Sequence, residues 1–290
     1  MKQKIEDNWK IVRNRSCIRA LLIFLGIVLM QMLAYMVCVV VMTVAAMVVK
    51  GDQGAMMKKL ADANVGNREF ATWISLVSAV LSLVWCAILY KRSDWRVEQF
   101  DYKKAFSVKN IAAIGAAGVG SCMVLTIVLS FLAAIFPAAF QDYNKLMQNM
   151  TGTGEILTVI YVLLIGPISE EFVFRGAIFD RFYLAFPFWT ANLLQAALFG
   201  LYHMNLIQGL YAFLLGMLLG MVKQSIGSIY ANIGLHIIFN ATSYLIGILF
   251  EESVAKNVLL PCFLLLFGVA LSYVGIRRFA KVYHDKTDDV

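Results

Sequence analysis

Long apolar runs recur from one end of the chain to the other, and they constrain the fold more than any other feature. Several exceed the ~18–20 residues that a helix needs to cross the hydrocarbon core of a bilayer. Hydrophobic residues make up 61% of the 290 residues and charged residues only 15%, whereas about 25% is usual for a soluble domain. The sequence therefore predicts an all-α polytopic membrane protein with short loops and no separate soluble domain.

We expect about eight transmembrane helices. The first apolar stretch is too long for the core of a signal peptide, so it is predicted to stay as an uncleaved helix. The predicted spans are about 20–49, 70–90, 110–136, 155–182, 188–204, 207–223, 227–250 and 257–276. The chain then divides into a basic N-terminal tail (1–19), about three N-terminal helices (20–150), a core (151–250) that carries most of the polar residues within spans, and a last helix with its tail (251–290).

Lys and Arg residues indicate the orientation. If the N-terminus is cytoplasmic, the segments on that side hold about three times as many Lys and Arg residues as the segments on the other side. Both termini are therefore predicted to be cytoplasmic, and the short loops favour a bacterial plasma membrane. The net charge of +7 follows from this clustering of basic residues at helix ends, so we expect no nucleic-acid partner.

Charged residues interrupt the fourth span. Residues 166–176 read Gly-Pro-Ile-Ser-Glu-Glu-Phe-Val-Phe-Arg-Gly, which places Glu170, Glu171 and Arg175 inside an apolar helix. A charge near the bilayer centre costs roughly 2.5–3.5 kcal/mol on insertion scales, so such residues usually face a protein interior or a water-filled cavity. The three residues indicate a functional site; the alternative is a structural ion network.

The Gly166-Pro167 pair is predicted to break or kink this helix, because proline lacks a backbone donor. A half-helix would then begin just after the proline, with its dipole favouring the carboxylates of its first turn. Glu171 and Arg175 are four residues apart and are expected to pair. Glu170 lies about 100° around the helix from Glu171, so we expect Glu170 to face a substrate and to do the chemistry.

Two later helices carry polar stripes. The stripe on the fifth span consists of Asn192, Gln195, Phe199 and His203, and the stripe on the seventh consists of Asn232, His236, Asn240 and Tyr244. Such stripes can simply hold helices together, at about 0.6 kcal/mol per hydrogen bond. Counting ~1.5 Å per residue nevertheless places Glu170, His203, His236 and Asn240 at similar depths near mid-membrane, where they could form one site.

A carboxylate and two imidazoles in a partly dry pocket suit the hydrolysis of an amide. The carboxylate can take a proton from water, and a histidine can share that water. A His–Asn pair one turn apart can donate hydrogen bonds to the developing oxyanion. The alternative is a zinc site, with His203, His236 and a carboxylate as ligands and an open position for water. The expected cofactor is accordingly either none or Zn.

Motifs of other intramembrane hydrolases are missing from the sequence. It contains no His-Glu-x-x-His, no Gly-x-Gly-Asp and no Gly-x-Ser-x-Gly. This excludes the common metalloprotease helix, an aspartyl dyad of the usual kind and a serine nucleophile elbow.

Three short motifs in order resemble the signature of a known family. That family is the CPBP family of CAAX proteases and bacteriocin-processing membrane proteins, also called the Abi or type II CAAX prenyl endopeptidase family. The resemblance covers about residues 155–245. The motifs are Glu170-Glu171-x-x-x-Arg175, Phe199-x-x-x-His203 and His236-x-x-x-Asn240.

The resemblance implies an intramembrane protease that acts on a peptide or membrane-protein substrate within the lipid bilayer. It implies that Glu170 acts on the water together with His203, and that His236 and Asn240 support the oxyanion. It leaves open whether the enzyme is a metalloprotease or a metal-free glutamate protease. The remaining motif residues would have supporting roles; they are Glu171, Arg175 and Phe199.

Fold resemblance does not fix the role of a protein. Bacterial relatives are linked to processing of signal or bacteriocin peptides, to self-immunity and to scaffolding of membrane sensors. A non-catalytic immunity or scaffold protein is therefore one alternative, and a carrier built on a broken helix is another. A protease would lose function in Glu170→Gln with folding intact, a scaffold would keep it, and a carrier would move its substrate across liposomes.

Overall fold

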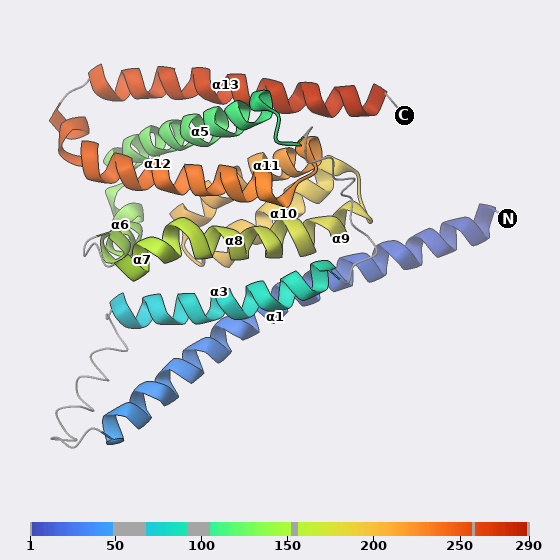
Figure 1. Cartoon of the computed structure of the whole chain (residues 1–290), viewed down its shortest axis with the longest axis horizontal. Coiled ribbons are helices and arrows are strands. Elements are labelled where there is room, and N and C mark those ends of the chain that lie inside the picture. The colour runs from blue at the N-terminus through green and yellow to red at the C-terminus, as the bar shows by residue number, and fades with distance from the viewer. Residues whose placement is uncertain (1, 49–67, 92–104, 152–155, 257–258, 289–290) are drawn as a thin grey trace.

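The computed structural model describes residues 2–48, 68–91, 105–151, 156–256 and 259–288, and the regular structure in these ranges is helical (Figure 1). The π-helical segments carry the label η. In chain order the elements are α1 (Lys2–Val48), α3 (Arg68–Lys91), α5 (Val108–Ile135), α6 (Pro137–Thr151), α7 (Ile156–Ile160), η1 (Tyr161–Ile165), α8 (Gly166–Glu171), η2 (Phe172–Ile178), α9 (Phe179–Tyr183), α10 (Phe188–Tyr202), α11 (Leu206–Ile226), α12 (Ile229–Lys256) and α13 (Leu259–Asp288).

Within the described ranges, 7 helical stretches are long and apolar enough to cross a bilayer. They correspond to seven of the predicted spans, and the all-α polytopic fold is confirmed. The remaining span, expected at about 188–204, is α10. Its 15 residues extend about 22 Å, which is less than the ~30 Å of a typical hydrocarbon core. One end of α10 must therefore lie within the membrane, or the bilayer must thin there.

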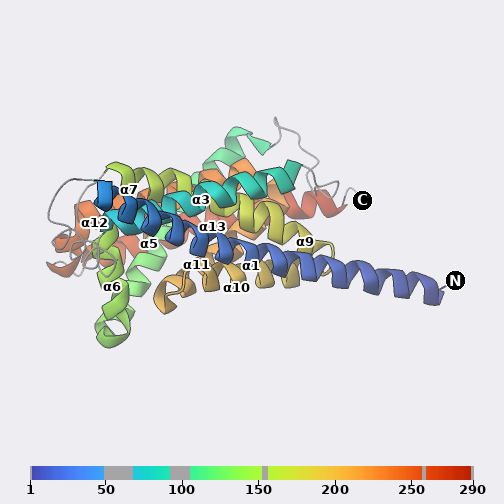
Figure 2. The same cartoon turned by 90° about the horizontal axis from the view of Figure 1, so that it is seen from below.

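The two ends of the chain lie on the same side of the bundle. The start of α1 and the end of α13 are both at the end marked N and C in Figure 1, and α1 extends past the other helices there (Figure 2). Helix α1 begins at Lys2. Residues 2–19 of the predicted basic tail are therefore helical and continuous with the first span. The 7 candidate spans together with α10 make an even number of crossings, which also places the start of α1 and the end of α13 on the same side of the membrane.

The fourth span lies in the middle of the bundle. Its α8 segment lies between α3 and α12 in Figure 1 and contacts both. Helices α10 and α11 form an antiparallel hairpin beside it, and α5 and α13 pack together on the far side of α12. Side chains from α8, α10 and α12 can therefore meet in the centre of the bundle.

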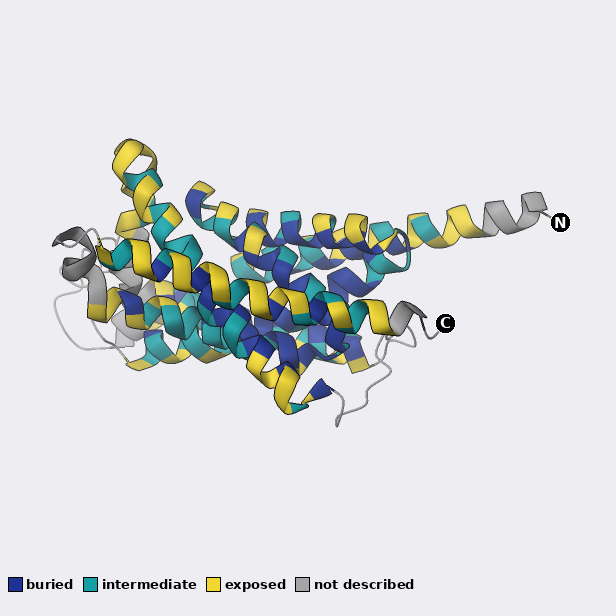
Figure 3. Cartoon of the chain, turned by 90° about the horizontal axis from the view of Figure 1, so that it is seen from above, coloured by how far each residue is buried: buried dark blue, intermediate teal, exposed yellow. Residues whose placement is uncertain are grey.

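Polarity is distributed as a bilayer requires. Figure 3 shows exposed residues along the outer faces of the helices and buried residues towards the centre. Much of the exposed surface is apolar, whereas Glu171 and Arg175 are both 0% exposed. Lipid accepts apolar side chains and excludes charges, so this arrangement supports an integral membrane protein. Exposed apolar residues of α1 include Leu21, Leu22, Leu25, Leu29, Met32 and Leu33.

The sequence predicted a break or a kink at Gly166-Pro167, and the break is wrong. The helix continues from Ile156 to Tyr183, and Ile165 and Gly166 both have right-handed helical backbone angles. A π-helical turn before α8 accommodates the proline within the helix. In this turn the Gly166 N–H donates to the carbonyl of Tyr161, five residues earlier. The wider π turn tolerates the missing donor of Pro167. No free helix N-terminus therefore forms here, and the expected dipole effect on the carboxylates does not apply.

Candidate active site

The candidate site contains a fully buried ion pair. Nη1 of Arg175 lies 3.0 Å from Oε1 of Glu171, and both side chains are 0% exposed, which confirms the predicted pair. The guanidinium carbon of Arg175 lies 4.4 Å from the centre of the Phe199 ring, a distance at which a cation is attracted to the π face. Removing either partner would leave a buried unpaired charge.

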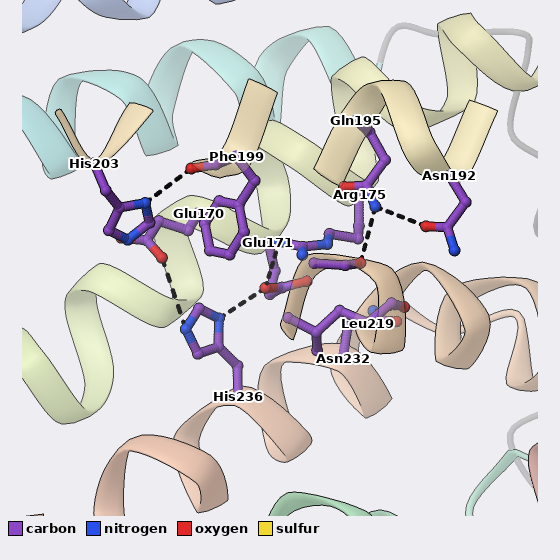
Figure 4. A network of polar contacts seen from close by, with 11 residues as sticks. Glu170, Glu171, Arg175, Asn192, Gln195, Phe199, His203, Leu219, Asn232 and His236 are labelled. Carbon is purple, nitrogen blue, oxygen red and sulfur yellow. Dashed lines mark hydrogen bonds and ion pairs between the residues drawn. The ribbon is translucent and has the colours of Figure 1, made fainter. Parts of the chain in front are cut away.

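His236 joins this ion pair to the second carboxylate. Its Nδ1 lies 2.8 Å from Oε1 of Glu171, and its Nε2 lies 3.7 Å from Oε2 of Glu170 (Figure 4). A carboxylate only accepts hydrogen bonds, so the Nδ1 atom carries the proton in this contact. In the neutral ring Nε2 then has a lone pair on the side of Glu170. Glu171 thus orients His236, a role that reasoning from the sequence missed.

Glu170 is the more accessible of the two glutamates. Its side chain is 17% exposed, whereas that of Glu171 is 0% exposed. The rotation of about 100° between neighbouring helix positions accounts for this difference, as the sequence predicted. The side chain of Glu170 therefore reaches the surface of the described structure, whereas that of Glu171 does not.

Phe199 places His203 in the same site. The Phe199 ring centroid lies 4.9 Å from the His203 ring and 6.0 Å from the His236 ring, with an edge-to-face arrangement in both cases (Figure 4). Nδ1 of His203 lies 2.8 Å from the carbonyl oxygen of Phe199. A carbonyl only accepts, so Nδ1 donates and Nε2 of the neutral ring is an acceptor. His203 follows the last residue of α10, where Met204 (φ 52°) ends the helix.

Asn240 lies one turn beyond His236 on α12. Its Nδ2 donates a 2.9 Å hydrogen bond to the carbonyl of Val162 in η1. The structure therefore gives this predicted catalytic residue a backbone partner next to the α8 segment. Of the four residues predicted to be catalytic, Glu170, His203 and His236 lie close together in Figure 4. Asn240 lies one turn further along α12, with its amide on the carbonyl of Val162.

The other ends of the two polar stripes hold helices together. Asn192, Gln195 and Asn232 each donate to a backbone carbonyl of α11. Gly220 of α11 makes this approach possible, because a Cβ there would overlap Oδ1 of Asn192. The structural alternative thus holds for these three residues, whereas the ends of the stripes with His203 and His236 meet at the two glutamates.

The alternative zinc site can be compared with the geometry. Catalytic zinc sites use three protein ligands. In the described part of the chain, no three His, Cys, Asp or Glu side chains are grouped so that they could hold a metal ion. His203 and His236 each use Nδ1 in a contact within the protein, which leaves Nε2 as a possible metal ligand. Among the described residues, however, these two nitrogens are not grouped with a third ligand.

The fold and the site together define an integral membrane protein with a buried Glu–Arg pair, an accessible glutamate and two histidines around one aromatic ring. Residues 152–242 match the family described as Type II CAAX prenyl endopeptidase Rce1-like. This segment contains all three motifs, and the resemblance to the CPBP family is confirmed over it. Comparisons of the chain with curated proteins and with solved structures found no match.

Proposed function

We propose that this chain is an intramembrane endopeptidase that hydrolyses a peptide bond in a membrane-associated peptide or protein. The observation that carries the proposal is the accessible carboxylate of Glu170, which lies 3.7 Å from Nε2 of His236 inside the segment that matches a protease family. A carboxylate beside an oriented imidazole is a suitable arrangement for moving a proton to and from water.

Glu170 acts as the general base and then as the general acid. It takes a proton from a water molecule while the oxygen of that water attacks the carbonyl carbon of the substrate. The C–N bond of the tetrahedral intermediate then breaks, and Glu170 returns the proton to the leaving nitrogen. The products are a new carboxylate and a new amine, and water is the only other reactant.

The two histidines assist at different atoms. Nε2 of His203 accepts a hydrogen bond from the same water, because its Nδ1 is occupied by the Phe199 carbonyl. When His236 is protonated, its Nε2 donates towards the substrate oxygen as negative charge develops there. Glu171 stabilises that cation through the contact with Nδ1. No step of this mechanism passes through a metal.

The proposed setting is a bacterial plasma membrane with both termini in the cytoplasm. The bias of Lys and Arg towards the segments on one side and the position of both chain ends at one end of the bundle support this orientation. The proposed substrates are peptides or proteins of that membrane, in peptide processing or immunity.

Isotopically labelled water tests the reaction directly. The purified protein in liposomes is incubated with membrane extract in H₂¹⁸O, and new peptide C-termini are identified by mass spectrometry. Hydrolysis by water places ¹⁸O in each new carboxylate, and we expect these labelled termini with the wild type but not with Glu170→Gln. Equal labelling with both proteins would contradict the proposed role of Glu170.

A further inference from the structure

The backbone about two helical turns before Glu170 contains a carbonyl group, that of Val162, which the helix itself does not satisfy. In a regular or π-helical turn, the carbonyl of Val162 would accept from the N–H of residue 166 or 167. The Gly166 N–H donates to the carbonyl of Tyr161 instead, and Pro167 has no N–H. The helix therefore supplies no partner to Val162 from the turn that follows it.

Asn240 supplies the missing donor from another helix. Its Nδ2 lies 2.9 Å from the Val162 oxygen, and 78 residues separate the two in sequence. The contact is partly buried. The hydrocarbon core offers no water to an unpaired carbonyl, so leaving this carbonyl without a partner is costly. The side chain of Asn240 thus replaces the hydrogen bond that Pro167 cannot make.

This contact belongs to a pair that fixes two helices relative to each other. Four residues earlier on α12, His236 contacts Glu171 at 2.8 Å. On the other helix, the contact points Val162 and Glu171 lie on either side of the proline, in η1 and α8. Two contacts at different heights prevent α12 from sliding along α8, and Glu170 lies directly beside the second contact.

We propose that Asn240 is a positioning residue: by satisfying the carbonyl that Pro167 leaves free, it sets the distance between Glu170 and His236. The inference rests on the proposed function, in which that pair carries the chemistry. It gives the third-motif asparagine a role that does not require contact with the substrate, unlike the expected role at the oxyanion.

A double-variant cycle between Asn240 and Pro167 tests the proposal. The Pro167→Ala change restores a backbone N–H that can donate to the Val162 carbonyl, which can accept two hydrogen bonds. We expect Asn240→Leu to lower kcat by about tenfold or more, with KM little changed, and to lower the melting temperature. When Pro167→Ala is also present, Asn240→Leu should lower kcat and the melting temperature much less. Pro167→Ser restores the same N–H and serves as a second variant.

Asn232→Leu is the matched control. Asn232 lies on the same helix and donates a 2.6 Å hydrogen bond to the carbonyl of Leu219, which has no connection to the proline. Its loss should lower the melting temperature by the same amount whether or not Pro167→Ala is also present. Relief of both asparagine variants by Pro167→Ala would show general stabilisation and would overturn the proposal.

The two readouts separate the possible failures. A wild type without proteolytic activity would overturn the proposed function, but the melting temperatures of the cycle would still measure the coupling between positions 167 and 240. Additive changes in melting temperature would overturn the positioning role. A loss of kcat in Asn240→Leu that Pro167→Ala leaves unchanged would also overturn it, and would favour direct contact with the substrate oxygen.

Discussion

Nδ1 of His236 lies 2.8 Å from Oε1 of Glu171, although 65 positions separate the two residues in sequence. The same carboxylate oxygen accepts a 3.0 Å hydrogen bond from Arg175. The buried ion pair and the proposed catalytic histidine are therefore one hydrogen-bonded unit. Changes to the ion pair should affect both the stability of the bundle and the chemistry at Glu170.

Glu171→Gln should destabilise the protein strongly, because it leaves the Arg175 guanidinium buried without its counter-charge. Breaking such a pair typically costs about 3–5 kcal/mol. Chemical or thermal unfolding in detergent measures the effect. Adding Arg175→Met to this variant removes the unpaired charge and should recover part of the stability; a double variant as unstable as the sum of the single changes would argue against this explanation.

Phe199→Leu should lower kcat more than a variant that destabilises the fold equally but lies outside the site. The ring lies over the Arg175 guanidinium, a contact worth about 0.5–2 kcal/mol, and it also lies against both histidine rings. Phe179→Leu is the control, since Phe179 is 0% exposed and is absent from the site. Unfolding and kcat are measured for both variants. Equal losses of kcat in the two would show that Phe199 acts by packing alone.

Gly220→Ala should destabilise the α10–α11 hairpin, because the new Cβ would overlap Oδ1 of Asn192. Forcing an extra carbon into packed structure typically costs about 1–3 kcal/mol. Gly115→Ala provides the comparison, since nothing lies within 4 Å of a Cβ at that position and alanine favours helix by about 1 kcal/mol. Melting temperatures should fall for the first variant only; equal values would mean that the two helices do not pack so closely.

Proteolysis by the purified protein should survive zinc chelators. The reason is that, in the described residues, no group of three potential ligands could hold a metal ion. The rate is measured before and after incubation with 1,10-phenanthroline, alongside the metal content of the protein. Inhibition that added zinc reverses, together with one bound zinc per chain, would instead support the metalloprotease alternative.

The sequence predicted the parts of this structure that depend on local spacing. Apolar runs long enough to cross a bilayer located the helices, and the spacing of four residues placed Glu171 against Arg175. The more accessible position of Glu170 followed from the same helical geometry. These features need only the pitch of a helix and the cost of charge in lipid.

Contacts between helices could not be predicted in this way. The Glu171–His236 and Val162–Asn240 contacts join segments 65 and 78 residues apart, and no local pattern encodes which faces meet. The π turn before Pro167 was also missed, since a proline in a helix usually indicates a break. Partners on α12 and the wider turn together let the helix continue through that residue.

Whether Glu170 carries out proteolysis is tested most directly by comparing the native host with a strain that carries only Glu170→Gln, at matched protein levels. Mass spectrometry measures the peptides in the membrane and in the medium. We predict a precursor that accumulates uncleaved in the variant strain while its product is missing. Identical peptide profiles, with the host phenotype intact, would contradict the protease account and favour a scaffold or immunity role.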